Sequence, residues 1–277
     1  MAAIDDIWLA ALTKDEDDAG SRNRFNLTVN IDGGDVFAHD FMLGWNVQGQ
    51  PIGLRDGHAG LEEATPPAPF DSDKLTNSSV RLGLRGDDAW APKHVMVIGR
   101  GQPDFMPGRF LTLAMETDVE RWLSSDGDEG PLTMPVRRVS SGNSNTVIRR
   151  VLLLVYTDRA DDVDTESDVK LQIFASGQLM LDQKLSHDFQ RARAYWHFLE
   201  VERPFTRADI VTKGSIHLGI LGTDAWLPKT VFVFGLDTEE GRPAEVVTLS
   251  AIPEWNLGWL STDASEGANS VPLPLSN

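Results

Sequence analysis

The sequence contains no cysteine among its 277 residues. The absence of thiols excludes disulfides, cysteine nucleophiles and thiolate metal sites. It leaves the cellular compartment open, because a chain without cysteine tolerates oxidising and reducing surroundings alike.

Positive charge is also scarce. The 25 Lys and Arg residues face 42 Asp and Glu residues, which gives a net charge of −17 at pH 7. We therefore expect no nucleic-acid partner, because phosphate binding needs clustered basic side chains. An anionic membrane would also repel the chain unless a cation bridged the two. The acidic excess either keeps the protein soluble or forms, in part, sites for divalent cations.

Long apolar runs are missing, and so are the short motifs of common enzymes. No stretch approaches the roughly 18 apolar residues of a membrane-spanning helix, so we expect no transmembrane segment. The first residues lack the basic start of a secretory signal peptide, so the expected location is cytoplasmic, or outside the cell after signal-independent export. Nucleophile-elbow, zinc-protease, Walker and dinucleotide motifs are all absent. We therefore predict a protein that is not an enzyme.

What the sequence does contain is a long internal repeat. Three blocks occur twice, in the same order and at nearly the same spacing: residues 13–27 with 157–171, 86–93 with 222–229, and 122–126 with 259–263. A repeat of this length is a whole domain rather than one supersecondary unit. We predict domains at residues 1–139 and 147–277, joined by a polar, flexible linker at 140–146.

Apolar residues recur at every second position in both halves, for example at 25–31 and 169–173. This period indicates half-buried strands, and the apolar run 151–155 indicates a strand buried on both faces. Short strands separated by Gly, Pro, Asp and Asn favour antiparallel sheets. The predicted fold is all-β, with two tandem antiparallel β-sandwiches related by internal duplication. The segment 34–69 is richer in Gly and Pro than its counterpart, which indicates either an ordinary variable loop or a specificity loop.

The order of these segments resembles the PLAT domain, the β-sandwich shared by polycystins, lipoxygenases and the alpha-toxin phospholipases. An opening strand leads through an acidic loop into a second strand at residues 151–173, and a strand, an Asp-Trp loop and another strand follow at 216–235. In each half a tryptophan, Trp90 or Trp226, stands shortly before a Val-x-Val strand, as in that family. The resemblance implies an eight-stranded sandwich with a binding role, and some members bind calcium at one end.

Carboxylates crowd the loops that would lie at that end. Calcium takes six to eight oxygen ligands, which such loops can supply, although the central Gly and closing Glu of an EF-hand are missing. The predicted Ca²⁺ ligands are Asp158, Asp161, Asp162, Asp164, Asp168 and Asp224 in the second half, and Asp15, Asp17, Asp18 and Asp88 in the first. Arg22 and Arg24 stand where the second half has acids, so the first site should be weaker. The alternative is a pair of ordinary solvated turns.

The repeated tryptophans leave two readings open. Trp90 and Trp226 either pin their loops onto the core with a satisfied N–H group, or contact a partner or a lipid surface. Trp122 and Trp259 are expected in the core. We predict a binding module for a protein or membrane-lipid surface, assisted by calcium. Alternatives are a structural component of a larger particle and a sandwich hydrolase. Exposed indoles would favour the binding module. A large apolar patch would favour the structural component, and a deep cleft with two opposed carboxyls would favour the hydrolase.

Overall fold

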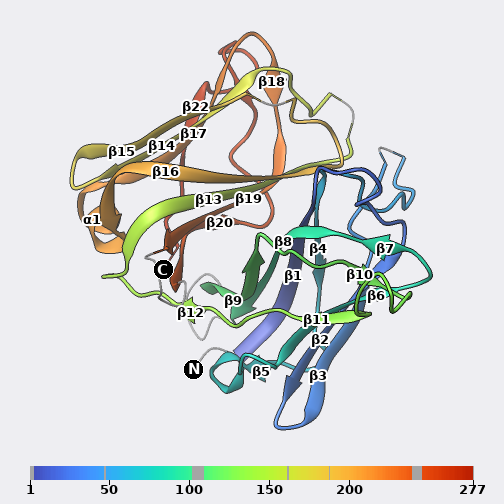
Figure 1. Ribbon diagram of the computed structural model, residues 1–277. Helices are drawn as coiled ribbons and strands as arrows, with labels where there is room; N and C mark the ends of the chain where they lie inside the picture. The colour runs from blue at the N-terminus through green and yellow to red at the C-terminus, as the bar shows by residue number, and fades with distance from the viewer. Residues whose placement is uncertain are drawn as a thin grey trace. The chain divides into compact units, whose positions relative to one another are not determined.

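The computed structural model describes residues 3–46, 48–101, 109–160, 162–186, 188–238 and 245–276. The chain forms two compact units, Met1–Val139 and Ser140–Asn277 (Figure 1). In the described ranges, helix is limited to α1 (Arg207–Lys213) and the 3-10 turn η1 (Ser72–Lys74). The prediction of a β-rich chain with antiparallel sheets is confirmed. Over the same ranges, neither helical segment has the length and apolar character needed to cross a membrane.

Most strands of the first unit lie in two antiparallel sheets. One has the order β4 (Ala59–Ala64), β1 (Ala3–Thr13), β8 (Pro92–Gly101) and β9 (Arg109–Thr117), with the short β5 (Phe70–Asp71) also on β1. The other has the order β11 (Thr133–Pro135), β6 (Val80–Arg85), β2 (Arg24–Ile31) and β3 (Gly34–Phe41). A small ribbon pairs β7 (Ala89–Trp90) with β10 (Leu123–Ser124).

The alternating sequence explains how these two sheets share one core. In β2, Phe25, Leu27 and Val29 are fully buried, whereas the residues between them are partly exposed. They pack in the same apolar cluster as Leu9 of β1 and Val97 of β8. Burying one side chain of this size contributes about 1.5–3 kcal/mol relative to leaving it in water. The period of two in the sequence therefore sets which face of each strand turns inward.

The second unit has the same two-sheet plan. One sheet has the order β20 (Glu245–Ile252), β19 (Pro228–Asp237), β13 (Val147–Thr157) and β16 (Ala194–Thr206). The other has the order β15 (Gln178–Leu185), β14 (Asp168–Ala175), β17 (Ser215–Leu221) and β22 (Ser270–Leu273). A ribbon again pairs two short strands, β18 (Ala225–Trp226) and β21 (Leu260–Ser261). Residues 151–155, predicted to be buried on both faces, are buried throughout within β13.

The segment 140–146, predicted as a flexible linker, is instead tied to the second unit. Ser140–Ser141 form β12, which pairs in parallel with β20. The Gly142 N–H donates to the Val246 carbonyl at 2.8 Å, and the Thr146 hydroxyl donates to Glu245 Oε2 at 3.0 Å. The polar side chains that indicate a linker in the sequence serve here as hydrogen-bonding partners of an ordered segment.

Candidate functional site

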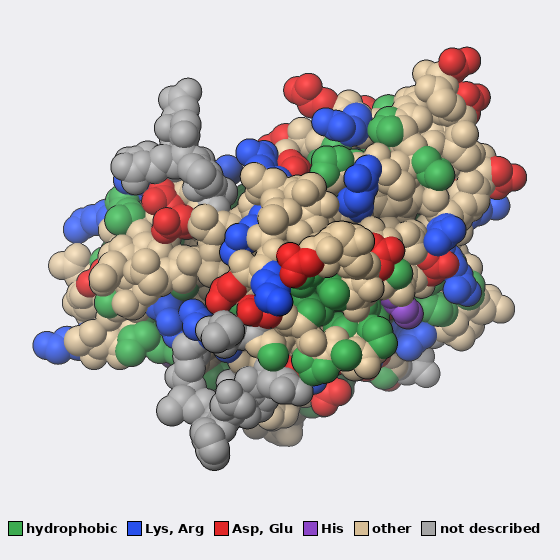
Figure 2. Space-filling view, turned by 90° about the horizontal axis from the view of Figure 1, so that it is seen from below, with side chains coloured by type: hydrophobic (Ala, Val, Ile, Leu, Met, Phe, Trp, Pro, Cys, Tyr) green, Lys and Arg blue, Asp and Glu red, His purple; other side chains and the backbone are tan. Residues whose placement is uncertain are grey.

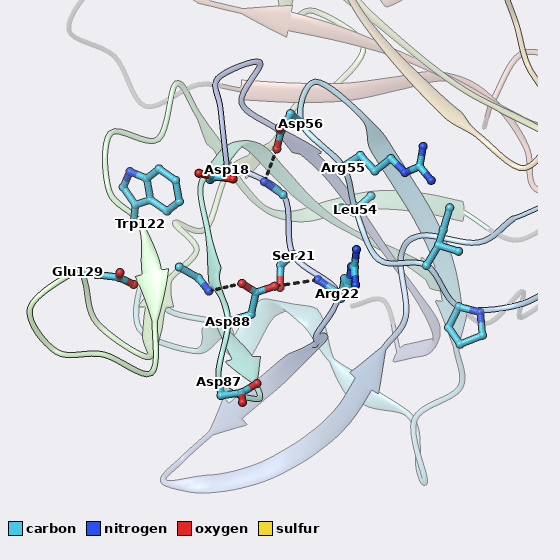
Figure 3. A pocket seen from close by; sticks show the side chains of 14 residues that line it. Asp18, Ser21, Arg22, Leu54, Arg55, Asp56, Asp87, Asp88, Trp122 and Glu129 are labelled. Atoms are coloured by element: carbon cyan, nitrogen blue, oxygen red, sulfur yellow. Dashed lines mark hydrogen bonds between the residues drawn. The ribbon is translucent and has the colours of Figure 1, made fainter.

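Four loops of the first unit surround a cavity of about 1080 Å³ (Figure 3). They are the segments around residues 18–22, 51–56, 87–89 and 122–129. The first follows β1 and the second lies between β3 and β4. The third carries β7, and the fourth begins just before β10. The cavity is therefore built by chain segments that lie far apart in the sequence.

Backbone hydrogen bonds join the first three loops to one another. Ser21 N–H donates to the Leu54 carbonyl at 2.8 Å, and Gly20 N–H donates to Asp56 Oδ1 at 2.5 Å. Only glycine fits at position 20, because an added Cβ would lie 2.7 Å from the Leu54 carbonyl oxygen. Asp88 closes the frame by accepting the N–H of Arg22 at 3.1 Å. The walls of the cavity are thus preformed rather than assembled by a ligand.

A tight turn fixes the fourth loop and the indole that it presents. Trp122 is half-buried and lines the cavity. Directly after it, the Ser124 hydroxyl donates to Glu129 Oε2 at 2.9 Å and also accepts the N–H of Asp126 at 3.0 Å. Gly130 packs against Trp122 so closely that an added Cβ would lie 2.4 Å from the Trp122 carbonyl oxygen. The turn therefore fixes the backbone from which the indole projects.

Charged side chains of both signs face this cavity. Arg22, Arg55, Asp18 and Asp87 are exposed lining residues. Their side chains make no ion pair or hydrogen bond with the described parts of the chain. Figure 3 places Trp122 on one side of the cavity and the two arginines on the other. Donors and acceptors for a ligand are therefore available on both sides.

The second unit uses the same contacts at the corresponding repeat positions. Trp226 Nε1–H donates to the Thr157 hydroxyl at 3.2 Å, as Trp90 Nε1–H does to Thr13 at 3.0 Å. Three hydrogen bonds donated by backbone N–H groups also recur. The bond from Arg22 to Asp88 corresponds to the bond from Glu166 to Asp224. The bonds from Ser21 to Leu54 and from Ala91 to Ala19 correspond to those from Thr165 to Phe189 and from Leu227 to Val163. The Ser124–Glu129 contact likewise matches Ser261–Glu266 at 2.9 Å.

The side chains placed on this common frame differ in the second unit. Phe189 stands where the first unit has Leu54, and it is fully buried against Trp226, with 4.9 Å between ring centroids. Arg191 stands where the first unit has Asp56, and its Nε lies 3.6 Å from Asp164. Burial raises the pKa of the neighbouring Tyr195 to about 12. In this unit the groups at the loop end are used to hold the loops to one another.

Where the structure describes them, the predicted calcium ligands do not gather into one site. Asp158, Asp164 and Asp168 lie 3.8, 3.6 and 2.5 Å from Lys229, Arg191 and Lys184. The hydrogen bond from Lys184, and a further one from Ser186, lower the pKa of Asp168.

Asp88 and Asp224 each accept two backbone N–H groups. The other predicted ligands in the described ranges, Asp15, Asp17, Asp18 and Asp162, are exposed, and Asp161 lies outside those ranges. Over the described residues, no three Asp, Glu or His side chains converge in a group that could hold a metal ion. Calcium binding by these loops stays a prediction.

The structure distinguishes the two pairs of repeated tryptophans. Trp90 and Trp226 are fully buried, so the prediction that they contact a partner or a lipid surface is wrong. Each pins its loop to the core through its N–H group and through aromatic packing, as between Trp90 and Phe25 at 4.5 Å. Trp122 and Trp259, expected in the core, are instead partly exposed. Trp122 and Trp259 therefore place partly exposed indoles just before the Leu-Ser-x-Asp turns.

The cavity itself was not predicted from the sequence, although two signals pointed toward it. The segment 34–69, which differs between the two halves of the sequence, supplies the wall at 51–56. The repeated block at 122–126 supplies the indole. Neither signal reveals that the two segments meet, because their contact depends on the fold.

The surface gives little sign of an apolar docking face. Among the described residues, the large exposed hydrophobic side chains are Leu132, Val211 and Leu221. Figure 2 shows acidic and basic side chains interspersed over the face in view, with apolar side chains in small groups between them. The net negative charge therefore does not form a uniform acidic field on that face.

The chain matches no known family model, no curated protein and no solved structure. Its resemblance to PLAT domains accordingly stays an interpretation of the sequence pattern.

Proposed function

We propose that this chain is a non-enzymatic binding protein made of two antiparallel β-sandwiches related by internal duplication, and that its first unit holds the ligand in the loop cavity. The duplication is supported by the contacts that recur at the repeated positions, above all the buried Trp–Thr pairs. A duplicated frame whose two loop ends carry different side chains fits a protein in which one copy binds and the other has diverged.

The observation that carries the proposal is the set of unpartnered polar groups around a preformed cavity. Pockets that bind small molecules have volumes of roughly 300–1,000 Å³ and combine apolar walls with a few placed polar groups. The cavity of the first unit has a comparable volume, and Trp122, Ile52 and Leu54 provide apolar surface. Arg22, Arg55, Asp18 and Asp87 provide polar side chains that have no partner among the described residues.

The other functions have weaker support. A lipid surface would need exposed apolar anchors, and Trp90 and Trp226 are buried. A structural component would need a broad apolar patch, for which the scattered exposed hydrophobics give no support. A hydrolase would use opposed carboxyls as acid and base, but Asp56 and Asp88 already accept N–H groups that hold the loops together, and Asp18 and Asp87 are exposed rather than desolvated as a general acid usually is. Binding is therefore favoured over both assembly and catalysis.

Saturation-transfer NMR with a mixed library of sugars, amino acids, short peptides and nucleosides tests the proposal. We expect at least one compound to bind the wild-type chain, to lose its signal with Trp122→Ala, and to keep it with the matched variant Trp259→Ala. Far-UV circular dichroism verifies that both variants fold. The proposal fails if no compound binds, or if binding is indifferent to Trp122.

A further inference from the structure

We propose that the cavity of the first unit binds a neutral oligosaccharide, with Trp122 as the surface on which a sugar ring stacks and with Arg22, Arg55 and Asp18 as hydrogen-bonding partners of its hydroxyl groups. This inference rests on the proposed binding function and specifies the chemical class of the ligand.

The charges that line the cavity are the first argument. Unpartnered guanidinium groups (Arg22, Arg55) and unpartnered carboxylates (Asp18, Asp87) share one concave site. A phosphate or another anion would meet the carboxylates, and a basic peptide would meet the arginines, so each is opposed by part of the wall. A hydroxyl group donates one hydrogen bond and accepts others. A polyhydroxylated, uncharged ligand can therefore satisfy both kinds of side chain at once.

The position of Trp122 is the second argument. Its indole combines a large apolar face with low conformational freedom, and the turn closed by Ser124 and Glu129 fixes its backbone. A sugar ring presents C–H groups on its faces and hydroxyl groups at its edges. The indole face of Trp122 can contact the C–H groups of the ring, while the neighbouring polar side chains bind the hydroxyl groups at its edge. Because the backbone is fixed and an indole has only two side-chain torsions, little conformational entropy is lost on binding.

The size of the cavity favours a chain of sugars over a single ring. Its volume of about 1080 Å³ lies just above the range of roughly 300–1,000 Å³ for sites that bury a drug-sized ligand. Trp122 and Arg55 stand on different sides of it (Figure 3). A ligand that contacts both must extend across the cavity, which an oligosaccharide does.

The second unit supplies an internal comparison. Glu166 occupies the position of Arg22, and Gln190 occupies that of Arg55, as the matched contacts to Asp224 and the Thr165–Phe189 pairing indicate. The second unit therefore has no guanidinium group at either of these two positions, although it retains Trp259 at the position of Trp122. We therefore expect saccharide binding in the first unit alone.

Isothermal titration calorimetry with neutral hexasaccharides of the α-glucan, β-glucan, xylan, mannan and chitin types tests the inference on the full-length protein. We expect at least one to bind at millimolar concentration or below. Trp122→Ala should weaken that binding by about 30-fold, the loss typical of a hot-spot residue. Trp259→Ala should leave it within about twofold of the wild type. Affinity should be nearly the same at low and high salt, because an uncharged ligand is not screened.

A second variant guards against a folding defect in Trp122→Ala. Arg22→Glu combined with Arg55→Gln introduces the residues of the second unit at two exposed positions, and it should lower the affinity by about 10-fold, as expected for one or two lost hydrogen bonds to charged groups. Hexalysine and inorganic phosphate serve as charged probes. If either of them binds and no hexasaccharide does, the saccharide assignment is wrong while the binding function survives. If no probe and no compound of the mixed library binds, both proposals fail.

Discussion

Replacing Thr13 with valine tests how the loops are fixed to the core. The Thr13 hydroxyl accepts the Trp90 indole N–H at 3.0 Å, and both side chains are fully buried. Valine keeps the branched shape but replaces the hydroxyl group with a methyl group. The indole N–H then loses this acceptor in a place that water does not reach. Leaving a buried donor unsatisfied costs about 1–3 kcal/mol, and we expect Thr13→Val to lower the free energy of unfolding by that amount.

The repeat provides a matched pair for this experiment. Thr157→Val removes the acceptor of Trp226 at 3.2 Å, and the expected loss lies in the same range because Thr157 and Trp226 are also fully buried. Thr223 is exposed and serves as the control. Its replacement by valine should change the free energy of unfolding by less than about 0.5 kcal/mol, as is usual for surface positions.

Urea unfolding followed by tryptophan fluorescence and circular dichroism measures these effects as shifts of midpoint at constant slope. The double variant Thr13→Val/Trp90→Phe isolates the hydrogen bond, because phenylalanine has no N–H group to satisfy. A coupling free energy of at least about 0.5 kcal/mol is expected between the two changes. Additive effects, or a Thr13→Val variant as stable as the exposed control, would refute the role assigned to this hydrogen bond.

Three further predictions concern stability. Asp88→Ala and Asp224→Ala should each lower the free energy of unfolding by roughly 1 kcal/mol in calcium-free buffer, since both carboxylates accept backbone N–H groups; losses seen only with calcium present would instead indicate a metal site. Gly20→Ala should cost about 1–3 kcal/mol, because its Cβ would lie 2.7 Å from the Leu54 carbonyl oxygen, and an unchanged thermal midpoint would contradict that. Thr206, the N-cap residue of α1, donates hydrogen bonds to Asp209 and lowers the pKa of that carboxyl below its ordinary value of 3.8. The contribution of Asp209 to the free energy of unfolding is therefore complete above that pH and is lost on further acidification. Asp209→Asn should flatten this acid dependence in urea titrations, and an equally steep profile would count against it.

The sequence predicts the sheets well because their signal is local. Alternation at 25–31 and 169–173 specifies which residues of β2 and β14 turn inward. The apolar run at 151–155 specifies a strand that is buried throughout. Each of these patterns depends on burial by neighbours of any kind, so no knowledge of the partner strand is needed.

The site is harder to predict because it depends on contacts between distant segments. The approach of Leu54 to Ser21 follows from the way the loops fold back, and no local pattern encodes it. For the same reason the acidic loops resemble a calcium site in the sequence, whereas Asp168 is paired with Lys184 on the neighbouring strand. The exposure of the tryptophans was hard to predict for the same reason. Their short sequence contexts do not distinguish Trp90, which is buried, from Trp122, which lines a cavity.

The most direct test of ligand binding in the first unit is a titration observed at the indole N–H groups of the eight tryptophans. Two-dimensional ¹H–¹⁵N NMR spectra are recorded as the tightest-binding neutral hexasaccharide is added, and Trp122→Phe and Trp259→Phe assign the signals of these two partly exposed indoles. The account predicts a saturable shift of the Trp122 signal, with Trp259 unchanged. A shift of Trp259 as large as that of Trp122, or a ligand that binds by calorimetry and leaves the Trp122 signal in place, would contradict it.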